Sequence, residues 1–352
     1  MAAAATQMRR EIGEIPDVVA RLVAESRLEL GAVAGAIDRA DPGWIMIAGR
    51  GTSDHAAVYA QYLFETHLGL PTGLVKPSVT TIYGAQLDWS RGLVVAISQS
   101  GRSPDVVEVI EAARRSGALT LAITNEPDSP LAAAAELNVG CHAGHELAVP
   151  ATKTYVAELG ALAALVGALR PSSGLAEALA SMPDAVRGVL SLSDEWLEGP
   201  GAEVVTALAD ADRALLVSRG YNLATAFELA LKLKETCGLF AEAYSTADFA
   251  HGPLVLAGAG VPTLAIRPGG PMGELVDATV SAVAGRGGRT TIIGGPEVTG
   301  RDGALALLHA VPEALSPLLF VIPGQLLVEA TARRRGIDPD SPVGLLKVTL
   351  TH

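Results

Sequence analysis

Short apolar runs alternate along this chain with longer stretches whose apolar positions have helical spacing. In the first half, the strand candidates are residues 44–48, 93–97 and 119–124, and the helix candidates are residues 8–40, 55–67 and 104–115. Strands that alternate with helices of this length predict a parallel sheet with helices on both faces. The first half of the chain is therefore expected to form an α/β domain.

The same pattern begins again after residue 201. The sequence Ile-Ala-Gly-Arg-Gly-Thr-Ser at residues 47–53 is similar to Leu-Val-Ser-Arg-Gly-Tyr-Asn at residues 216–222, and each follows the order strand, Arg-Gly turn, helix. This match predicts an internal duplication of one α/β unit. We expect an N-terminal helical segment at 1–40, a first domain at 41–170, a helical linker at 171–201, a second domain at 202–336 and a tail at 337–352. The second domain has further strand candidates at residues 262–266 and 290–293 and a helix candidate at residues 315–335.

One predicted helix of the second half has charged residues on a single face. Glu228, Lys232 and Glu235 follow i, i+4 and i+7 spacing, so they lie within roughly 40° of one another around the helix axis. Most of the other positions are apolar, which is typical of a buried helix. The three charges are then either an ion-pair row in the interior or proton-transfer groups in a cleft. The helix alone leaves both interpretations open, as well as a surface i, i+4 pair.

Two predicted strand-to-helix turns are rich in hydroxyl side chains. Such turns lie at the carboxyl ends of parallel strands, where α/β sheets bind ligands, and their hydroxyl and amide groups can bind a phosphate. Ordinary helix capping also selects Ser and Thr, but two such turns in one domain favour anion binding. The residues in question are Gly51, Thr52 and Ser53 in the first turn, and Ser98, Gln99, Ser100 and Ser103 in the second. Neither turn is a dinucleotide fingerprint or a Walker A motif.

Two isolated residues carry little meaning by composition alone. His251 precedes Gly-Pro, which is expected to leave its imidazole at a helix end, and Lys347 stands alone in an apolar tail. The sequence contains no metal-ligand motif and no serine-hydrolase elbow. We expect neither a metal nor a cofactor.

Composition narrows the functional classes. The chain has 352 residues, of which 49% are hydrophobic and 18% charged, and a formal net charge of −12. This charge argues against nucleic-acid binding but leaves a small anionic ligand open. Two cysteines form no disulfide framework, the N-terminus has no signal-peptide pattern, and apolar runs such as residues 159–169 are too short to span a membrane. A cytoplasmic protein without membrane contact is expected.

Taken together, these motifs resemble the sugar isomerase (SIS) family over nearly the whole chain, and in particular the tandem isomerase module of glucosamine-6-phosphate synthases. The two hydroxyl-rich turns match the phosphate-binding turns of the family. The matching catalytic motifs are Leu-Ala-Leu-Lys-Leu-Lys-Glu at 229–235, Ala-Glu-Ala-Tyr at 241–244, His-Gly-Pro at 251–253, and Lys347. The resemblance implies two tandem SIS subdomains, each a mainly parallel five-stranded sheet in a three-layer α-β-α, flavodoxin-like arrangement.

The resemblance also implies a role for each matching residue. Glu235 would move a proton between C1 and C2 of the sugar, and Glu228 and Lys232 would position Glu235. His251 would open the sugar ring from the neighbouring subunit of a homodimer, and Lys347 would approach the carbonyl carbon as a Schiff-base lysine. The two turns would hold the phosphate of a hexose or hexosamine 6-phosphate, and Val149 would contact the substrate.

Two departures from the synthases narrow the expected activity. Residue 2 is Ala2 and about 40 residues precede the first predicted strand, so no glutaminase is expected within this sequence. The second turn has Arg102 and Ser103 where the synthase loop has Glu and Thr, and resembles the stand-alone second class of glucosamine-6-phosphate deaminases. We therefore expect a deaminase. Sugar-phosphate isomerisation, synthesis with ammonia or a separate glutaminase, and a non-catalytic sugar-phosphate sensor are the alternatives.

Overall fold

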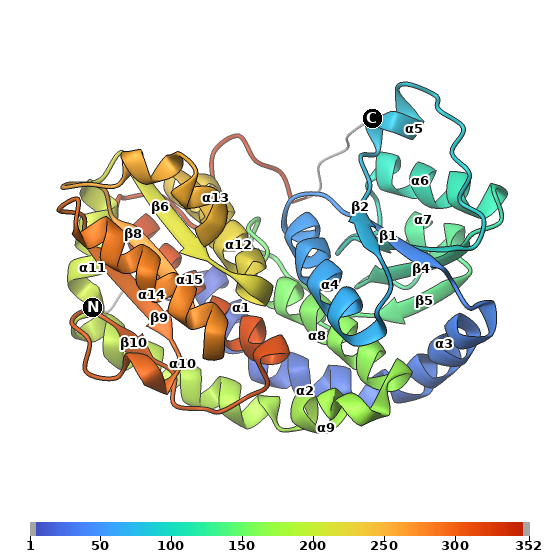
Figure 1. Ribbon diagram of the computed structural model, residues 1–352, viewed down its shortest axis with the longest axis horizontal. Helices are drawn as coiled ribbons and strands as arrows, with labels where there is room; N and C mark the ends of the chain where they lie inside the picture. Colours follow the sequence, from blue (N-terminus) through green and yellow to red (C-terminus); the bar gives the residue numbers. More distant parts are fainter. Residues whose placement is uncertain (1–4, 348–352) are drawn as a thin grey trace. The chain divides into compact units, whose positions relative to one another are not determined.

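The computed structural model describes residues 5–347 (Figure 1). Within this range the chain forms two compact units, each containing one parallel sheet. The sheet-A unit comprises residues 15–146, 153–183 and 346–347, and the sheet-B unit comprises residues 5–14, 147–152 and 184–345. Each unit is described by its own sheet and helices.

Sheet A is entirely parallel, with the strand order β2-β1-β3-β4-β5. Its strands are β1 (Trp44–Ala48), β2 (Thr72–Leu74), β3 (Gly92–Ile97), β4 (Leu119–Thr124) and β5 (Leu137–Gly140). This is the flavodoxin-like order, in which the chain changes direction across the sheet between the first and third strands. All six residues of β3 are buried, as expected for a central strand covered on both faces.

Helices flank sheet A. Val94 and Ala96 on β3 pack in one core cluster with Val106 and Ile110 of α6. Helix α4 contacts β1 and β3 and also packs against α8. The helices of this unit are α2 (Ile15–Glu25), α3 (Arg27–Ala40), α4 (Thr52–Leu68), α5 (Ser78–Thr81), α6 (Pro104–Arg115), α7 (Pro130–Ala134), α8 (Lys153–Leu169) and α9 (Leu175–Ala180).

Sheet B repeats the topology of sheet A. Its order, β10-β9-β8-β6-β7, again places the first strand of the unit between the second and the third, and every pairing is parallel. The predicted similarity between residues 47–53 and 216–222 thus falls on equivalent first strands, which confirms the duplicated fold. The strands are β6 (Arg213–Ser218), β7 (Phe240–Ser245), β8 (Thr263–Arg267), β9 (Thr290–Gly294) and β10 (Leu305–Ala306).

The helices of the sheet-B unit include the predicted acid–base helix, α12. It contacts β6, β7 and the long helix α15. The helices are α1 (Gln7–Gly13), α10 (Met182–Glu198), α11 (Gly201–Asp210), α12 (Leu223–Cys237), α13 (Thr246–Ala250), α14 (Gly270–Ala284) and α15 (Ser316–Arg334). Short 3-10 turns occur at Pro171–Ser173, Gly220–Asn222, Pro253–Leu256, Pro296–Val298 and Glu313–Leu315.

The structure corrects two expectations. The predicted helix at residues 8–40 is three helices, α1, α2 and α3, and Pro16 lies in the first turn of α2, where its missing N–H is tolerated. The segment Glu313–Arg334 is long and apolar enough to cross a membrane by length and composition, contrary to the expectation that no run would be. In this fold, however, 94% of its most apolar window is buried, as in the core helix of a globular domain.

Candidate active site

The acid–base row lies on α12, directly after β6. The 3-10 turn Gly220–Asn222 connects the strand to the helix, and Gly238 ends the helix in the left-handed conformation, with φ of 59°. A glycine at this position avoids the steric cost that a Cβ would bring. The 3-10 turn and Gly238 thus define the two ends of the helix that carries the row.

Lys232 contacts both carboxylates of the row. Nζ of Lys232 lies 3.2 Å from Oε1 of Glu228 and donates a hydrogen bond of 2.7 Å to Oε2 of Glu235. The side chains of Glu228 and Lys232 are 0% and 1% exposed, whereas that of Glu235 is 26% exposed. Glu235 is therefore the member of the row that reaches solvent, and the interpretation as a surface ion pair is wrong.

The two carboxylates determine the charge of Lys232. Burial alone lowers the pKa of this lysine, because the charged form loses its hydration. The nearby carboxylates of Glu228 and Glu235 act in the opposite direction and outweigh burial, so that the pKa of Lys232 is raised well above its usual value. The charged form of Lys232 is thus favoured, and its hydrogen bond holds the carboxylate of Glu235.

His251 belongs to the same unit. It follows the last residue of α13, and its backbone N–H donates to the carbonyl of Asp248 at 3.1 Å. The side chain is exposed. Its position at a helix end agrees with the prediction from the Gly-Pro that follows it.

The two hydroxyl-rich turns lie side by side in the sheet-A unit. They follow β1 and β3, which are neighbouring parallel strands, at the point where the strand order reverses. Open α/β sheets bind their ligands at this position. Ser103, the N-cap residue of α6, makes no side-chain capping hydrogen bond, so ordinary capping does not account for its hydroxyl group.

The hydroxyl groups of these turns differ in their surroundings. The Ser53 hydroxyl is buried and donates to Oε1 of Glu158 at 2.7 Å, and Oγ of Ser98 accepts from the N–H of Gly101 at 3.2 Å. Thr52, Gln99, Ser100 and Ser103 are half-buried at the same edge of the sheet. The Ser53–Glu158 contact connects the first turn to α8.

Gly101 is required by the second turn. It has φ of +60°, and a Cβ at this position would lie 2.1 Å from Oγ of Ser129. We expect Gly101→Ala to destabilise the protein by at least about 1–2 kcal/mol, from the left-handed backbone alone, and to weaken sugar-phosphate binding. Urea denaturation and calorimetric titration with fructose 6-phosphate measure these effects. The double variant Gly101→Ala/Ser129→Gly should recover only the steric part of the loss, and full recovery would contradict the backbone argument.

An ion pair that the sequence analysis missed connects the two turns. Nε of Arg50, in the first turn, donates to Oδ2 of Asp105 at 2.7 Å, and Asp105 lies in the first helical turn after Ser103. The Asp105 side chain is 1% exposed. The Arg-Gly and Ser-Pro-Asp patterns were visible in the sequence, but nothing in their spacing showed that they meet.

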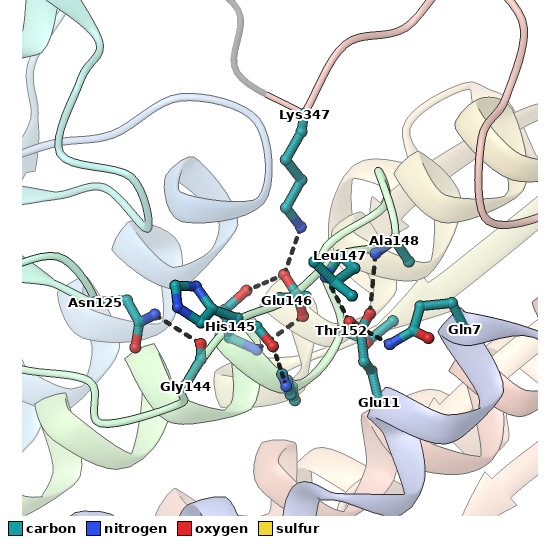
Figure 2. Close-up of polar contacts among 12 residues, drawn as sticks. Gln7, Glu11, Asn125, Gly144, His145, Glu146, Leu147, Ala148, Thr152 and Lys347 are labelled. Carbon is teal, nitrogen blue, oxygen red and sulfur yellow. Dashed lines mark hydrogen bonds and ion pairs between the residues drawn. The ribbon is translucent and has the colours of Figure 1, made fainter.

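Lys347 also lies in the sheet-A unit, where it contacts a residue that sequence reasoning did not select. Its Nζ donates to Oε2 of Glu146 at 2.8 Å (Figure 2). Val149 belongs to the sheet-B unit, where its N–H donates to the carbonyl of Asp340 at 2.9 Å.

The predicted site residues therefore form two sets. One set, in the sheet-A unit, comprises the two hydroxyl-rich turns and Lys347, and the other, in the sheet-B unit, comprises Glu228, Lys232, Glu235, Val149 and His251. Chemically, the first set can bind an anion and supply a primary amine or ammonium. The second can transfer a proton through a carboxylate held beside a fixed cation.

A relative of similar sequence is named for a sugar phosphate. The glutamine–fructose-6-phosphate aminotransferase (isomerizing) of Methanothermobacter thermautotrophicus is 34% identical over 348 residues, which cover 97% of this chain and 56% of that protein. The chain thus spans a little over half the length of this relative.

Solved structures agree in fold. A Silicibacter pomeroyi DSS-3 protein assigned as a phosphosugar isomerase is 37% identical, with a TM-score of 0.84 and coverage of 96% of this chain and 100% of that one. The C-terminal domain of glucosamine-fructose-6-phosphate aminotransferase from Francisella tularensis is 27% identical, also with a TM-score of 0.84, and covers 97% of this chain and 99% of its own.

The sequence model of the SIS domain matches the chain twice, at residues 40–168 and 207–328. Each match contains one of the two five-stranded sheets, in agreement with the duplicated topology. This protein is a member of the SIS domain family.

Proposed function

We propose that this protein is a glucosamine-6-phosphate deaminase, which converts the amino-sugar phosphate to fructose 6-phosphate and ammonia. The observation that carries the proposal is the row on α12, in which a buried ammonium holds one partly exposed carboxylate at 2.7 Å. A carboxylate in such a setting can take a proton from a carbon next to a carbonyl and return it to the neighbouring carbon.

In the proposed reaction, Glu235 removes the C2 proton of the open-chain sugar, which gives an enolamine, and delivers a proton to C1. The product is an imine at C2. Water adds to C2 to form a C–O bond, the C2–N bond of the resulting carbinolamine breaks with its electrons going to nitrogen, and ammonia leaves the ketone of fructose 6-phosphate. Lys232 keeps Glu235 in place throughout, and Glu228 balances the buried charge of Lys232.

The other predicted residues have supporting roles in this proposal. The two hydroxyl-rich turns bind the phosphate through their hydroxyl and amide groups, at the edge of sheet A where such ligands bind. His251, exposed at the end of α13, assists ring opening in the neighbouring subunit of a homodimer. Val149 contacts the substrate, and Lys347 approaches its carbonyl carbon.

A second candidate is the synthesis of glucosamine 6-phosphate from fructose 6-phosphate and ammonia. The observation in its favour is the 34% identity to a glutamine–fructose-6-phosphate aminotransferase. Arg102, which is exposed in the second turn, favours deamination because the turn resembles that of the stand-alone deaminases. The two candidates share the proton transfer and differ in the direction of the nitrogen step.

One experiment separates these functions. The purified protein is incubated with glucosamine 6-phosphate, with fructose 6-phosphate alone, and with fructose 6-phosphate plus ammonium, and ammonia, ketose phosphate and aldose phosphate are measured together. We expect stoichiometric ammonia and fructose 6-phosphate from the first mixture. Net glucosamine 6-phosphate from the third mixture without release in the first would favour synthesis, and binding without turnover in all three would indicate a sensor.

A further inference from the structure

The contact between Lys347 and Glu146 fixes the end of the described chain to the loop before α8. Glu146 lies between β5 and α8, and its side chain is 0% exposed, while that of Lys347 is 25% exposed. Figure 2 shows the lysine extending from the tail segment towards the carboxylate. Burying a carboxylate costs free energy unless its oxygens accept hydrogen bonds. The groups that donate to Glu146 therefore indicate its role.

Thr154 and Lys347 both donate hydrogen bonds to this carboxylate. The backbone N–H of Thr154 donates to Oε1 at 3.1 Å, the Thr154 hydroxyl donates to Oε2 at 2.6 Å, and Lys347 donates to the same Oε2 at 2.8 Å. Thr154 is the second residue of α8, a helix of 17 residues. The N-terminus of a helix stabilises negative charge, so α8 contributes to holding this carboxylate independently of the lysine.

The ion pair with Glu146 holds Nζ of Lys347 at 2.8 Å and directs one of its N–H groups at the carboxylate. A lysine attacks a carbonyl carbon through the lone pair of its free amine. The freedom of Lys347 to attack therefore depends on whether Glu146 retains its Nζ.

We propose that Glu146 is a positioning residue that holds Nζ of Lys347 in an ion pair and restrains its attack as a nucleophile. The assignment rests on the proposed function, in which Lys347 approaches the substrate carbonyl. While it is paired, Lys347 acts through its charge and its N–H groups, and it becomes a nucleophile only after it leaves Glu146 and loses a proton to solvent. Glu146 itself does not contact the reacting atoms.

The test measures the reactivity of Lys347 directly, without sugar. Full-length protein is treated with trinitrobenzenesulfonate at neutral pH, and the labelling rate of Lys347 is followed by peptide mass spectrometry in the wild type, Glu146→Gln and Glu146→Asp. Loss of a charged hydrogen bond should raise the rate roughly ten-fold in Glu146→Gln. Glu146→Asp, whose carboxylate is withdrawn by one methylene, should give an intermediate rate, and it provides the test if the Gln variant does not fold.

Lys234 is the control in the same digests. Lys234 is 42% exposed and pairs with Glu242. Both residues lie in the sheet-B unit, whereas Glu146 belongs to the sheet-A unit, so the labelling rate of Lys234 should not change. Glu329→Gln is the matched control variant, because Glu329 is also buried and paired with a basic side chain, Arg333. An unchanged rate at Lys347 in Glu146→Gln, or an equal rise in Glu329→Gln, would overturn the proposal.

Turnover supplies a second readout. In the paired state Lys347 acts at the carbonyl through its charge and its N–H groups, and Glu146→Gln no longer positions it there. This variant should therefore lower kcat for ammonia release, while KM for glucosamine 6-phosphate, which depends on the phosphate-binding turns, changes less. The two proposals fail separately. Faster labelling in a protein that releases no ammonia would refute the deaminase and support the role of Glu146, whereas ammonia release with unchanged labelling would refute only the role of Glu146.

Discussion

Replacing Glu235 with glutamine is expected to lower the rate of ammonia release from glucosamine 6-phosphate by about 10²–10⁴-fold, the usual contribution of a general acid–base group. The amide has nearly the same shape and can still accept a hydrogen bond from Lys232, but it cannot take the C2 proton. Because Glu235 is 26% exposed, the substitution should change the stability only slightly. Initial rates of ammonia and ketose phosphate formation at several substrate concentrations provide the measurement.

Glu111→Gln is the matched control for this variant. Glu111 is also an exposed acid that contacts a basic side chain, since its Oε2 lies 3.7 Å from Nη1 of Arg115, but it belongs to none of the matching motifs and has no place in the proposed reaction. The control should retain the wild-type rate. Glu235→Gln should still bind fructose 6-phosphate, because the phosphate turns are unchanged. Near-normal ammonia release by Glu235→Gln would refute the proposed proton transfer.

The fold was predictable from the sequence wherever a strand was long and apolar. β1, β3, β4, β6, β8 and β9 all fall within or next to the predicted runs. Strands β2, β5, β7 and β10 were not predicted, and the reasons are physical. β2, β5 and β10 have only three, four and two residues. β7, Phe240–Ser245, contains Glu242 and pairs with a single neighbour at the sheet edge.

The candidate site was predictable to the extent that its residues are close in sequence. The spacing of Glu228, Lys232 and Glu235 alone predicted a shared helix face, because helical periodicity is a local property. The extent of burial was not predictable, since it depends on β6, β7 and α15, which pack against α12. Burial is what distinguishes the observed row from a surface ion pair.

Contacts between residues far apart in the sequence could not be predicted from the pattern of apolar and polar positions. Glu146 and Lys347 are separated by 201 residues, and Arg50 and Asp105 by 55. No periodicity connects such pairs, and only the folded sheet-A unit brings them within hydrogen-bond distance. The resemblance to the SIS family selected Lys347 but gave no indication of its partner.

Replacing Lys232 with methionine is expected to destabilise the protein by about 3–5 kcal/mol, the usual effect of removing one partner from a buried ion pair. Methionine fills a similar volume, so the loss comes mainly from charge. Glu228, which is 0% exposed, would be left as a buried carboxylate without its cation, and Glu235 would lose its 2.7 Å hydrogen bond. Urea denaturation measures the change, and ammonia release should fall as well because Glu235 is no longer held.

The nature of the loss can be tested with two further variants. Lys234→Met removes a neighbouring lysine that is 42% exposed and should change the stability by no more than about 0.5 kcal/mol. In Glu228→Gln/Lys232→Met both buried charges are absent, and most of the stability should return, because removal of a whole buried pair is often nearly neutral. Activity should not return with it, since the ammonium that fixes Glu235 is still missing. A double variant as unstable as Lys232→Met would show that packing, and not the removal of the Lys232 charge beside Glu228, determines the loss.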